Sequence, residues 1–264
     1  MNKKIILLAA AALTMLFTAC GGTKSSKTTD ETDTLAFEQE QIEENIMAQL
    51  DSIADLWGSI KPTEGLYTEG KIQLTEDEKK VKPTYLLKAK DVADLSLLSQ
   101  KYRAIGMLTV DRNVMLLHEG GTEVMDAALT KIASEVGDNA IKGVNSKSMT
   151  DIKGLYKNEK ENGRINLFWE MASAAIIENL YVTSQNLDKF ILAFNDQQAS
   201  DLSYQVALLK LSLDDLATYD SNIKELDELL APLNSLNASN VEEFKAQLKA
   251  MKPQIETIRE QMLK

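Results

Sequence analysis

The sequence predicts an all-α protein, a multi-helix bundle of antiparallel helical hairpins. Beyond residue 34, apolar residues recur every three or four positions through most of the chain, which is the helical period. No run of alternating apolar and polar residues rivals this pattern. The 264 residues include only 12 glycines and 4 prolines, too few for a many-turned β fold. An irregular helical solenoid is the second choice.

The first helix is predicted over residues 35–60, where one stripe of apolar residues follows the helical spacing. That stripe consists of Leu35, Ile42, Ile46, Leu50, Ile53, Trp57 and Ile60. Pro62 ends it because proline lacks a backbone donor and restricts the residue before it. Residues 61–90 form the least regular segment. Within them, Thr75 and Glu78 have the spacing of a capping box that opens one short helix.

Three further helices are predicted in the middle of the chain. A long one covers residues 91–117, with Asp91 as its N-cap and the Gly120-Gly121 pair after its end. A shorter one covers residues 122–136. Residues 137–147 are predicted as a loop, and residues 148–162 as another helix.

Residues 164–194 form the most apolar segment of the mature chain and are predicted as one helix. A helix that is apolar most of the way round normally lies at the centre of a bundle. We do not interpret it as a membrane span, because Glu170 and Glu178 lie within it and charged groups are costly in lipid.

Three helices with short connections are predicted at the carboxyl end. Narrow apolar seams run over residues 202–216 and 223–233, and Ser239 with Glu242 has capping-box spacing before a last helix that reaches Met262. Such seams suit antiparallel packing at coiled-coil-like angles. Pro253 predicts a kink in the last helix.

Composition excludes several classes of function. The chain has 29 Lys+Arg and 40 Asp+Glu, a net charge of −11, so its surface should repel nucleic acid. One cysteine allows no internal disulfide, and one histidine allows no zinc site of the usual composition. We predict no metal ligands, no cofactor and no catalytic residue. The single histidine, His118, is near a predicted helix end, where it suits a carbonyl-capping role.

Charged residues inside apolar helices are the best candidates for a polar site. They are Arg103, Asp111, Arg112, Glu170 and Glu178. If they are buried they must be paired, because an isolated buried charge is costly. Three interpretations remain open: cross-helix Glu–Arg ion pairs that fix helix register, a polar pocket for a small ligand or cation, and carboxylate acid–base catalysis.

The amino terminus has the features of an export signal. A basic Asn2-Lys3-Lys4 start precedes an apolar run over residues 5–17, which is short for a membrane-spanning helix. Ala19-Cys20 follows the apolar run. In these twenty residues the chain resembles a bacterial lipoprotein precursor, although Phe17 occupies a position where that family usually has leucine. The resemblance implies cleavage between Ala19 and Cys20 and acylation of Cys20 with fatty acids such as palmitate.

The resemblance also implies a location. Gly21 follows the cysteine where inner-membrane lipoproteins commonly have aspartate, which favours the outer membrane. The first acidic residue after Cys20 is Asp30, which favours the periplasmic face over the cell surface. Residues 1–19 are then a signal peptide, residues 20–34 a lipidated flexible tether without apolar side chains beyond the cysteine, and residues 35–264 the helical domain. The tether would reach roughly 20 Å.

These features predict a lipid-anchored envelope protein with a binding or scaffolding role rather than an enzyme. The membrane, through the lipid, and an envelope protein are the expected partners. The alternative is a lipoprotein that binds a small ligand in a polar pocket of the bundle, and a carboxylate-dependent hydrolase is the third choice. The sequence identifies neither a ligand nor a protein partner.

Overall fold

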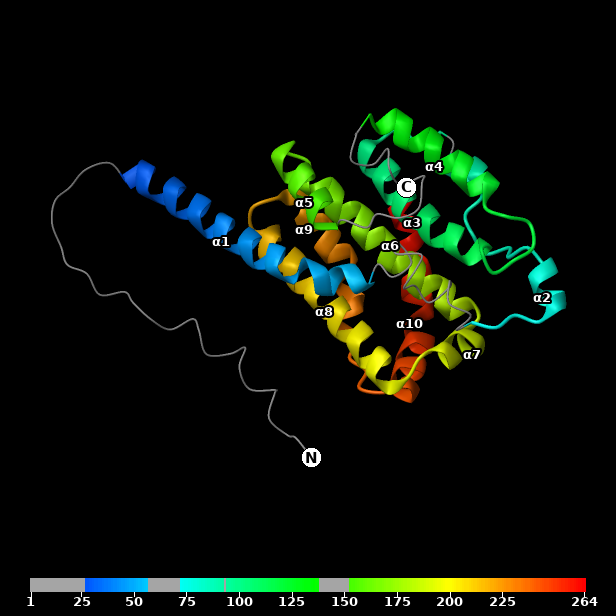
Figure 1. The fold of residues 1–264 in the computed structure, drawn as a ribbon. Coiled ribbons are helices and arrows are strands. Elements are labelled where there is room, and N and C mark those ends of the chain that lie inside the picture. The colour runs from blue at the N-terminus through cyan, green and yellow to red at the C-terminus, as the bar shows by residue number, and fades with distance from the viewer. Residues whose placement is uncertain (1–26, 57–71, 93, 138–151) are drawn as a thin grey trace. The chain divides into compact units, whose positions relative to one another are not determined.

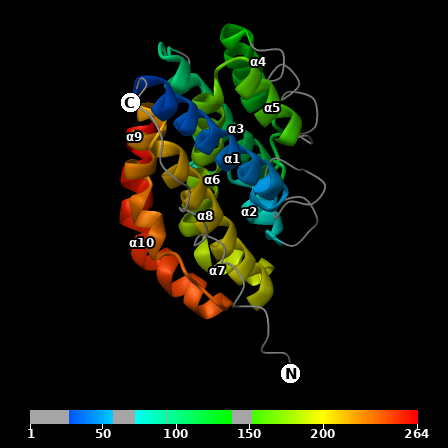
Figure 2. The same cartoon turned by 90° about the vertical axis from the view of Figure 1, so that its left-hand side faces the viewer.

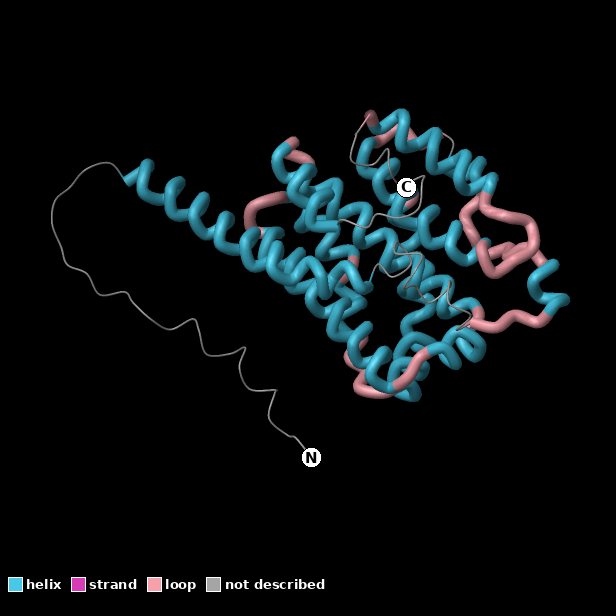
Figure 3. The backbone as a smooth tube through the Cα atoms, viewed as in Figure 1, coloured by secondary structure: helices cyan, strands magenta, loops and turns pink. Residues whose placement is uncertain are grey.

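The computed structural model describes residues 27–56, 72–92, 94–137 and 152–264, and confirms an all-α helical bundle. Within these ranges the chain forms helices and loops without strands (Figure 3). The chain divides into two compact units, residues 1–38 and 39–264, and the second contains the bundle. The predicted signal peptide, Ala19 and Cys20 lie outside the described residues, as does most of the predicted loop 137–147.

The first helix begins earlier than predicted. α1 covers Lys27–Leu56 and so includes residues 27–34 of the segment predicted as a flexible tether. Asp30, Glu31 and Asp33 fall in the first two turns, where acidic side chains stabilise the positive end of the helix dipole. Residues 57–60, the predicted end of the helix, lie outside the described residues.

The predicted capping box is confirmed. α2 covers Glu76–Lys80, with Thr75 as its N-cap. The Thr75 hydroxyl accepts a hydrogen bond from the Glu78 backbone N–H at 3.3 Å, and the Glu78 carboxylate accepts one from the Thr75 backbone N–H at 2.8 Å. Since no residue of α2 itself is buried, polar contacts position this short helix.

The start of the long middle helix was predicted wrongly. Asp91 belongs to the 3-10 turn η1 (Ala89–Val92), where its N–H donates to the Lys88 carbonyl. α3 covers Leu98–Met115, and the Gln100 side chain accepts from the Leu97 N–H at its start. The next helix is confirmed: α4 covers Glu123–Val136 and ends at Gly137, whose φ of 71° is left-handed. α5 covers Ile152–Glu161.

The apolar helix predicted over residues 164–194 is interrupted. α6 covers Ile165–Gln185, followed by the one-turn α7 (Leu187–Phe190) and the 3-10 turn η3 (Ile191–Ala193). The break is at Asn186, whose φ of −129° and ψ of 48° are not helical. Its side chain donates to the Tyr85 hydroxyl at 3.0 Å.

The last helices occur as predicted, with different caps and ends. α8 covers Asp196–Ala217 and is capped by Asn195, and α9 covers Ser221–Leu229 and is capped by Asp220. The 3-10 turn η4 (Ala231–Ser235) replaces the end of the predicted seam, with Pro232 in its first turn.

The cap of the last helix also differs from the prediction. α10 covers Val241–Met262, and its N-cap is Asn240, which accepts from the Glu243 N–H. Glu243, and not Glu242, accepts from the backbone of Ser239. The helix continues through Pro253 and follows a curved path in Figure 2.

α6 is the centre of the bundle, as predicted, and contacts α3, α5, α8, α9 and α10 (Figures 1 and 2). α3 and α4 pack on each other as an antiparallel hairpin, as do α8 and α9. Two contacts show that α3 and α6 run parallel. Arg103 pairs with Glu170, and Asp111 interacts with Glu178 eight residues further along both helices. The intervening α4 and α5 make this parallel arrangement possible.

A glycine sets how closely these parallel helices approach. A Cβ atom built on Gly106 of α3 would lie 2.3 Å from the Met171 carbonyl oxygen and 3.1 Å from the Ala175 nitrogen of α6. The two backbones are therefore in direct contact at this point. None of the described helices is both long enough and apolar enough to span a membrane.

Candidate functional site

Two of the predicted charged residues form an ion pair between the parallel helices. The Arg103 guanidinium donates to both Glu170 carboxylate oxygens, from Nε at 2.6 Å and from Nη2 at 2.8 Å. A bidentate pair of this kind fixes orientation as well as charge. The structure therefore brings Arg103 and Glu170 together as a register-fixing contact.

Asp111 and Glu178 belong to a second buried cluster, completed by a residue that the sequence analysis missed. Arg259 of α10 donates to Glu178 from Nε at 2.6 Å and from Nη2 at 2.9 Å. Its guanidinium carbon lies 4.1 Å from the centroid of the Tyr181 ring, a cation–π contact. The Leu87 N–H donates to Asp111 Oδ2 at 2.7 Å. Both carboxyl groups are fully buried, so this cluster joins α3, α6 and α10 in the core.

The cluster contains two acids and one guanidinium, which constrains its protonation. Burial raises the pKa of Asp111 well above its ordinary value, and the nearby Glu178 carboxylate raises it further. Burial also raises the pKa of Glu178, while Arg259 opposes that shift. We infer that Asp111 is protonated and donates from Oδ1, its otherwise unpartnered oxygen, to Glu178.

Replacing Asp111 with asparagine is expected to change how stability depends on pH. A raised folded-state pKa gives stability that is full below the unfolded pKa near 3.9 and is lost as pH rises toward the folded value. Asparagine keeps an N–H donor toward Glu178 but does not titrate. From pH 5 to pH 8, the free energy of unfolding of the wild type should fall by at least about 1 kcal/mol more than that of Asp111→Asn. Urea unfolding at the two pH values measures this difference. Parallel pH profiles would contradict the assignment.

Arg112 lies apart from both pairs. It donates to Asp126 of α4, and both side chains are partly exposed. The remaining four predicted residues form two separate clusters whose partners are protein groups. Three cavities in the described part of the protein measure about 560, 390 and 340 Å³, and none of them is lined by any of these five charged residues. None of the three is therefore the polar pocket predicted around those residues.

A pocket with apolar walls and several polar groups lies elsewhere, beside α2. It measures about 390 Å³. We call it the α2 pocket, and its lining residues are Leu74, Asp77, Glu78, Val81, Lys82, Pro83, Thr84, Tyr85, Leu117, His118 and Asn186. They come from α2 and the residues on either side of it, from the turn that follows α3, and from the break between α6 and α7. The irregular segment and the two helix ends thus meet at one place.

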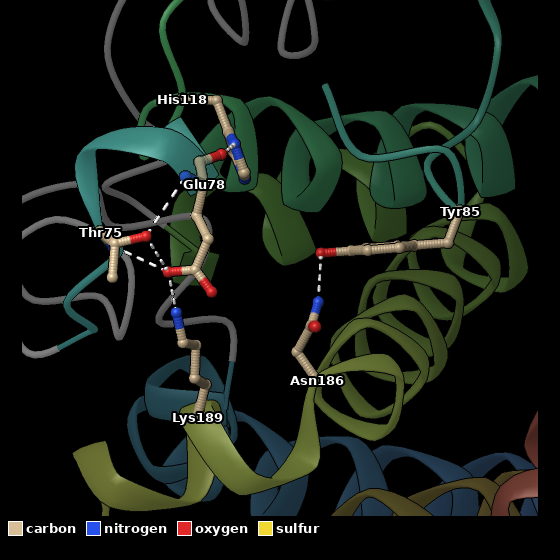
Figure 4. Close-up of polar contacts among 6 residues, drawn as sticks. All are labelled: Thr75, Glu78, Tyr85, His118, Asn186 and Lys189. Carbon is tan, nitrogen blue, oxygen red and sulfur yellow. Dashed lines mark hydrogen bonds and ion pairs between the residues drawn. The ribbon is translucent and has the colours of Figure 1, made fainter. Parts of the chain in front are cut away.

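His118 closes one side of this pocket (Figure 4). Its Nδ1 lies 3.1 Å from the Glu78 carbonyl oxygen. A carbonyl can only accept, so His118 Nδ1 carries a proton and donates this hydrogen bond. The histidine caps a carbonyl, as predicted, but the carbonyl belongs to α2 and not to the histidine's own helix. The Glu119 N–H also donates to α2, at the Lys79 carbonyl.

Tyr85 and Asn186 form the opposite side of the pocket (Figure 4). The Asn186 amide donates to the Tyr85 hydroxyl oxygen at 3.0 Å. Burial raises the pKa of Tyr85 to about 12, so the phenol keeps its proton at physiological pH. That O–H can therefore donate to a ligand.

Glu78 links α2 to the α6–α7 junction. Its Oε2 accepts from the Thr75 backbone and hydroxyl and from the Lys189 ammonium of α7 (Figure 4). These contacts, the Lys189 hydrogen bond first among them, lower the pKa of Glu78 to about 2. The carboxylate is therefore ionised throughout the physiological pH range.

Two further pockets differ in character. A groove of about 560 Å³ along α4 is lined by Val92, Val124, Ala127, Ala128 and Ile132, with Lys90, Glu123 and Lys131 at its edges. A third pocket, about 340 Å³, lies beside the Lys210–Asp227 ion pair between α8 and α9. The α2 pocket is distinguished by polar side chains from three separate segments facing one space.

Comparisons with known proteins found no relative. No protein family, curated protein or solved structure matches the chain. Among the residues that the structure describes, no three His, Cys, Asp or Glu side chains are grouped so that they could hold a metal ion.

Proposed function

We propose that this protein is a lipid-anchored bacterial envelope protein that binds a small molecule in the α2 pocket. The pocket itself carries the proposal, since ligand sites are typically concave, mostly apolar, and supplied with a few convergent polar groups. Leu74, Val81 and Leu117 supply apolar wall, and Tyr85, His118 and Asn186 supply hydrogen-bonding groups. Its volume of about 390 Å³ suits a small organic molecule.

The arrangement of the core supports placing the function at this edge. Arg103 and Arg259 each hold a glutamate in bidentate geometry, and Asp111 receives the Leu87 N–H. These groups are satisfied by one another and have little capacity left for a substrate. Carboxylate catalysis at Asp111 and Glu178 is therefore a weaker proposal than binding at the α2 pocket.

The anchor rests on Ala19-Cys20 after the basic and apolar start of the chain. Each buried CH2 of an acyl chain contributes about 0.8 kcal/mol to membrane binding, so several chains hold a protein stably. We place the protein at the periplasmic face of the outer membrane. Growth with labelled palmitate should label the wild type and leave Cys20→Ser unlabelled. A labelled Cys20→Ser protein would refute the anchor.

Native mass spectrometry of protein extracted from its own envelope tests the binding function. We expect a co-purifying molecule on the wild type and at least tenfold less of it on Tyr85→Phe, which removes one hydroxyl from the pocket. Tyr204→Phe removes a hydroxyl from an exposed tyrosine of α8 and is the matched control. Equal loading of the two variants, or an unloaded wild type, would contradict the proposal.

Binding of an envelope protein is the second candidate function, and the apolar groove along α4 favours it. Val124 is an exposed apolar residue of this groove, and it lies among the apolar lining residues Val92, Ala127 and Ile132. A photocrosslinking residue at position 124 should then capture one envelope protein in living cells. The same residue at position 204 is the control, and equal crosslinking from both positions would argue against a specific partner.

A further inference from the structure

We propose that the α2 pocket binds a primary amine, with its ammonium group at Glu78 and its apolar body against the pocket wall. This inference rests on the proposed function and names the class of ligand. It follows from the kinds of hydrogen-bonding group that the pocket presents, from its charges and from its walls.

Three polar groups of the pocket offer acceptor atoms. Glu78 uses Oε2 for Thr75 and Lys189, while Oε1 has no hydrogen bond in the described part of the chain. Since Nδ1 of His118 donates to the Glu78 carbonyl, Nε2 is an acceptor whenever the ring is neutral. Asn186 uses one N–H of its amide for Tyr85, so its carbonyl oxygen remains an acceptor and its second N–H remains a donor. The pocket therefore presents three acceptors, and a primary ammonium supplies three donors.

Figure 4 shows that the polar residues lie around one space. The Glu78 carboxylate is on one side, and the Tyr85 hydroxyl and the Asn186 amide are on the other. His118 lines the same pocket. A ligand placed between Glu78 and Asn186 can thus contact groups from α2, from the end of α3 and from the α6–α7 junction.

Charge favours a cation over an anion. Asp77 and Glu78 contribute two carboxylates to the lining and Lys82 contributes one ammonium. Lys82 is exposed, so its long side chain can keep its charge in water. Lys189 offsets the charge of Glu78 through Oε2, and Oε1 keeps its capacity to accept a further charge-assisted hydrogen bond. The net charge of −11 also attracts cations to the protein.

The lining side chains also include donors, namely the Lys82 ammonium and the Thr84 and Tyr85 hydroxyls. Of these, Figure 4 shows the Tyr85 hydroxyl beside the space between Glu78 and Asn186. A carboxylate ligand would place its charge beside Glu78, which is ionised at every physiological pH. Leu74, Val81, Pro83 and Leu117 offer the remaining wall to an alkyl or ring body.

Three probes with the same apolar tail separate the contributions of charge and hydrogen bonding: hexylammonium, hexanamide and hexanoate. His118 is the only histidine, so its imidazole gives one set of NMR signals that reports directly on the pocket. The protein is produced in its native host, so that it carries its natural processing, and is labelled with 13C-histidine. It is then placed in zwitterionic bicelles. Blank bicelles correct for partition of each probe into lipid.

We expect hexylammonium to shift the His118 signals and to bind at least tenfold more tightly than hexanamide or hexanoate. Glu78→Gln should weaken hexylammonium about tenfold and change hexanamide by less than about twofold. Glu225→Gln on the exposed face of α9 removes the same charge far from the pocket and should change neither. Unchanged His118 signals in the free variants would show that the fold is retained.

Each other outcome overturns the inference. If hexanoate or hexanamide binds as tightly as hexylammonium, the ligand class is wrong while the pocket remains a binding site. If no probe shifts His118, the amine inference fails, and the Tyr85→Phe loading experiment still decides the proposed function separately. If Glu225→Gln weakens hexylammonium as much as Glu78→Gln does, general charge attraction replaces the specific contact.

Discussion

Replacing Arg259 with methionine is expected to lower the free energy of unfolding by about 3–5 kcal/mol. The substitution leaves Glu178 and Asp111 buried together without a cation, and removal of one partner from a buried pair is more destabilising than its net contribution suggests. It also removes the cation over the Tyr181 ring. Urea unfolding followed by circular dichroism at pH 7 measures the change.

Arg112→Met is the matched control, because the Arg112–Asp126 pair is partly exposed. It should lower the free energy of unfolding by no more than about 1 kcal/mol. Replacing Arg259 and Glu178 together with apolar residues should recover much of the stability lost by Arg259→Met. If Arg259→Met and Arg112→Met lowered the free energy of unfolding by similar amounts, the buried cluster would contribute no more to stability than the partly exposed pair.

Gly106→Ala is expected to destabilise the protein by about 1–3 kcal/mol, although helix propensity alone predicts the opposite sign. In an open helix, alanine is more favourable than glycine by up to about 1 kcal/mol. At Gly106 the added methyl group would overlap the Met171 carbonyl oxygen of α6, a backbone atom that cannot move aside independently. The parallel helices α3 and α6 would have to separate.

The sign of this change makes the measurement decisive. Urea unfolding of Gly106→Ala should show a lower midpoint with a retained helical circular-dichroism spectrum. The Arg103–Glu170 pair lies one turn away and should loosen as the helices separate. A Gly106→Ala protein more stable than the wild type would contradict the close contact between α3 and α6.

The helices that depend on local pattern could be predicted from the sequence. α2 was predicted because Thr75 and Glu78 have capping-box spacing, and α6 was predicted as central because it is apolar around most of its surface. The break at Asn186 was missed because the apolar pattern continues past it, and the side-chain partner of Asn186, Tyr85, lies 101 residues earlier in the chain. The caps at Asn195 and Asn240 were missed although asparagine is a strong N-cap residue in sequence terms.

The site was predicted less completely, because its contacts are between distant segments. The spacing of Arg103, Asp111, Glu170 and Glu178 anticipated cross-helix pairing, yet no local signal connects Arg259 to Glu178, 81 residues away. The α2 pocket is assembled from an irregular segment, a helix end and a helix break. His118 was recognised as a carbonyl cap, but the identity of the carbonyl depends on the fold.

A crystal structure of the protein extracted from its own envelope would test the central claim most directly. We expect density for a non-protein molecule between Glu78 and Asn186, with Arg259 paired with Glu178. Density for a ligand among Arg103, Asp111, Glu170 and Glu178, with the α2 pocket filled by protein side chains, would contradict it.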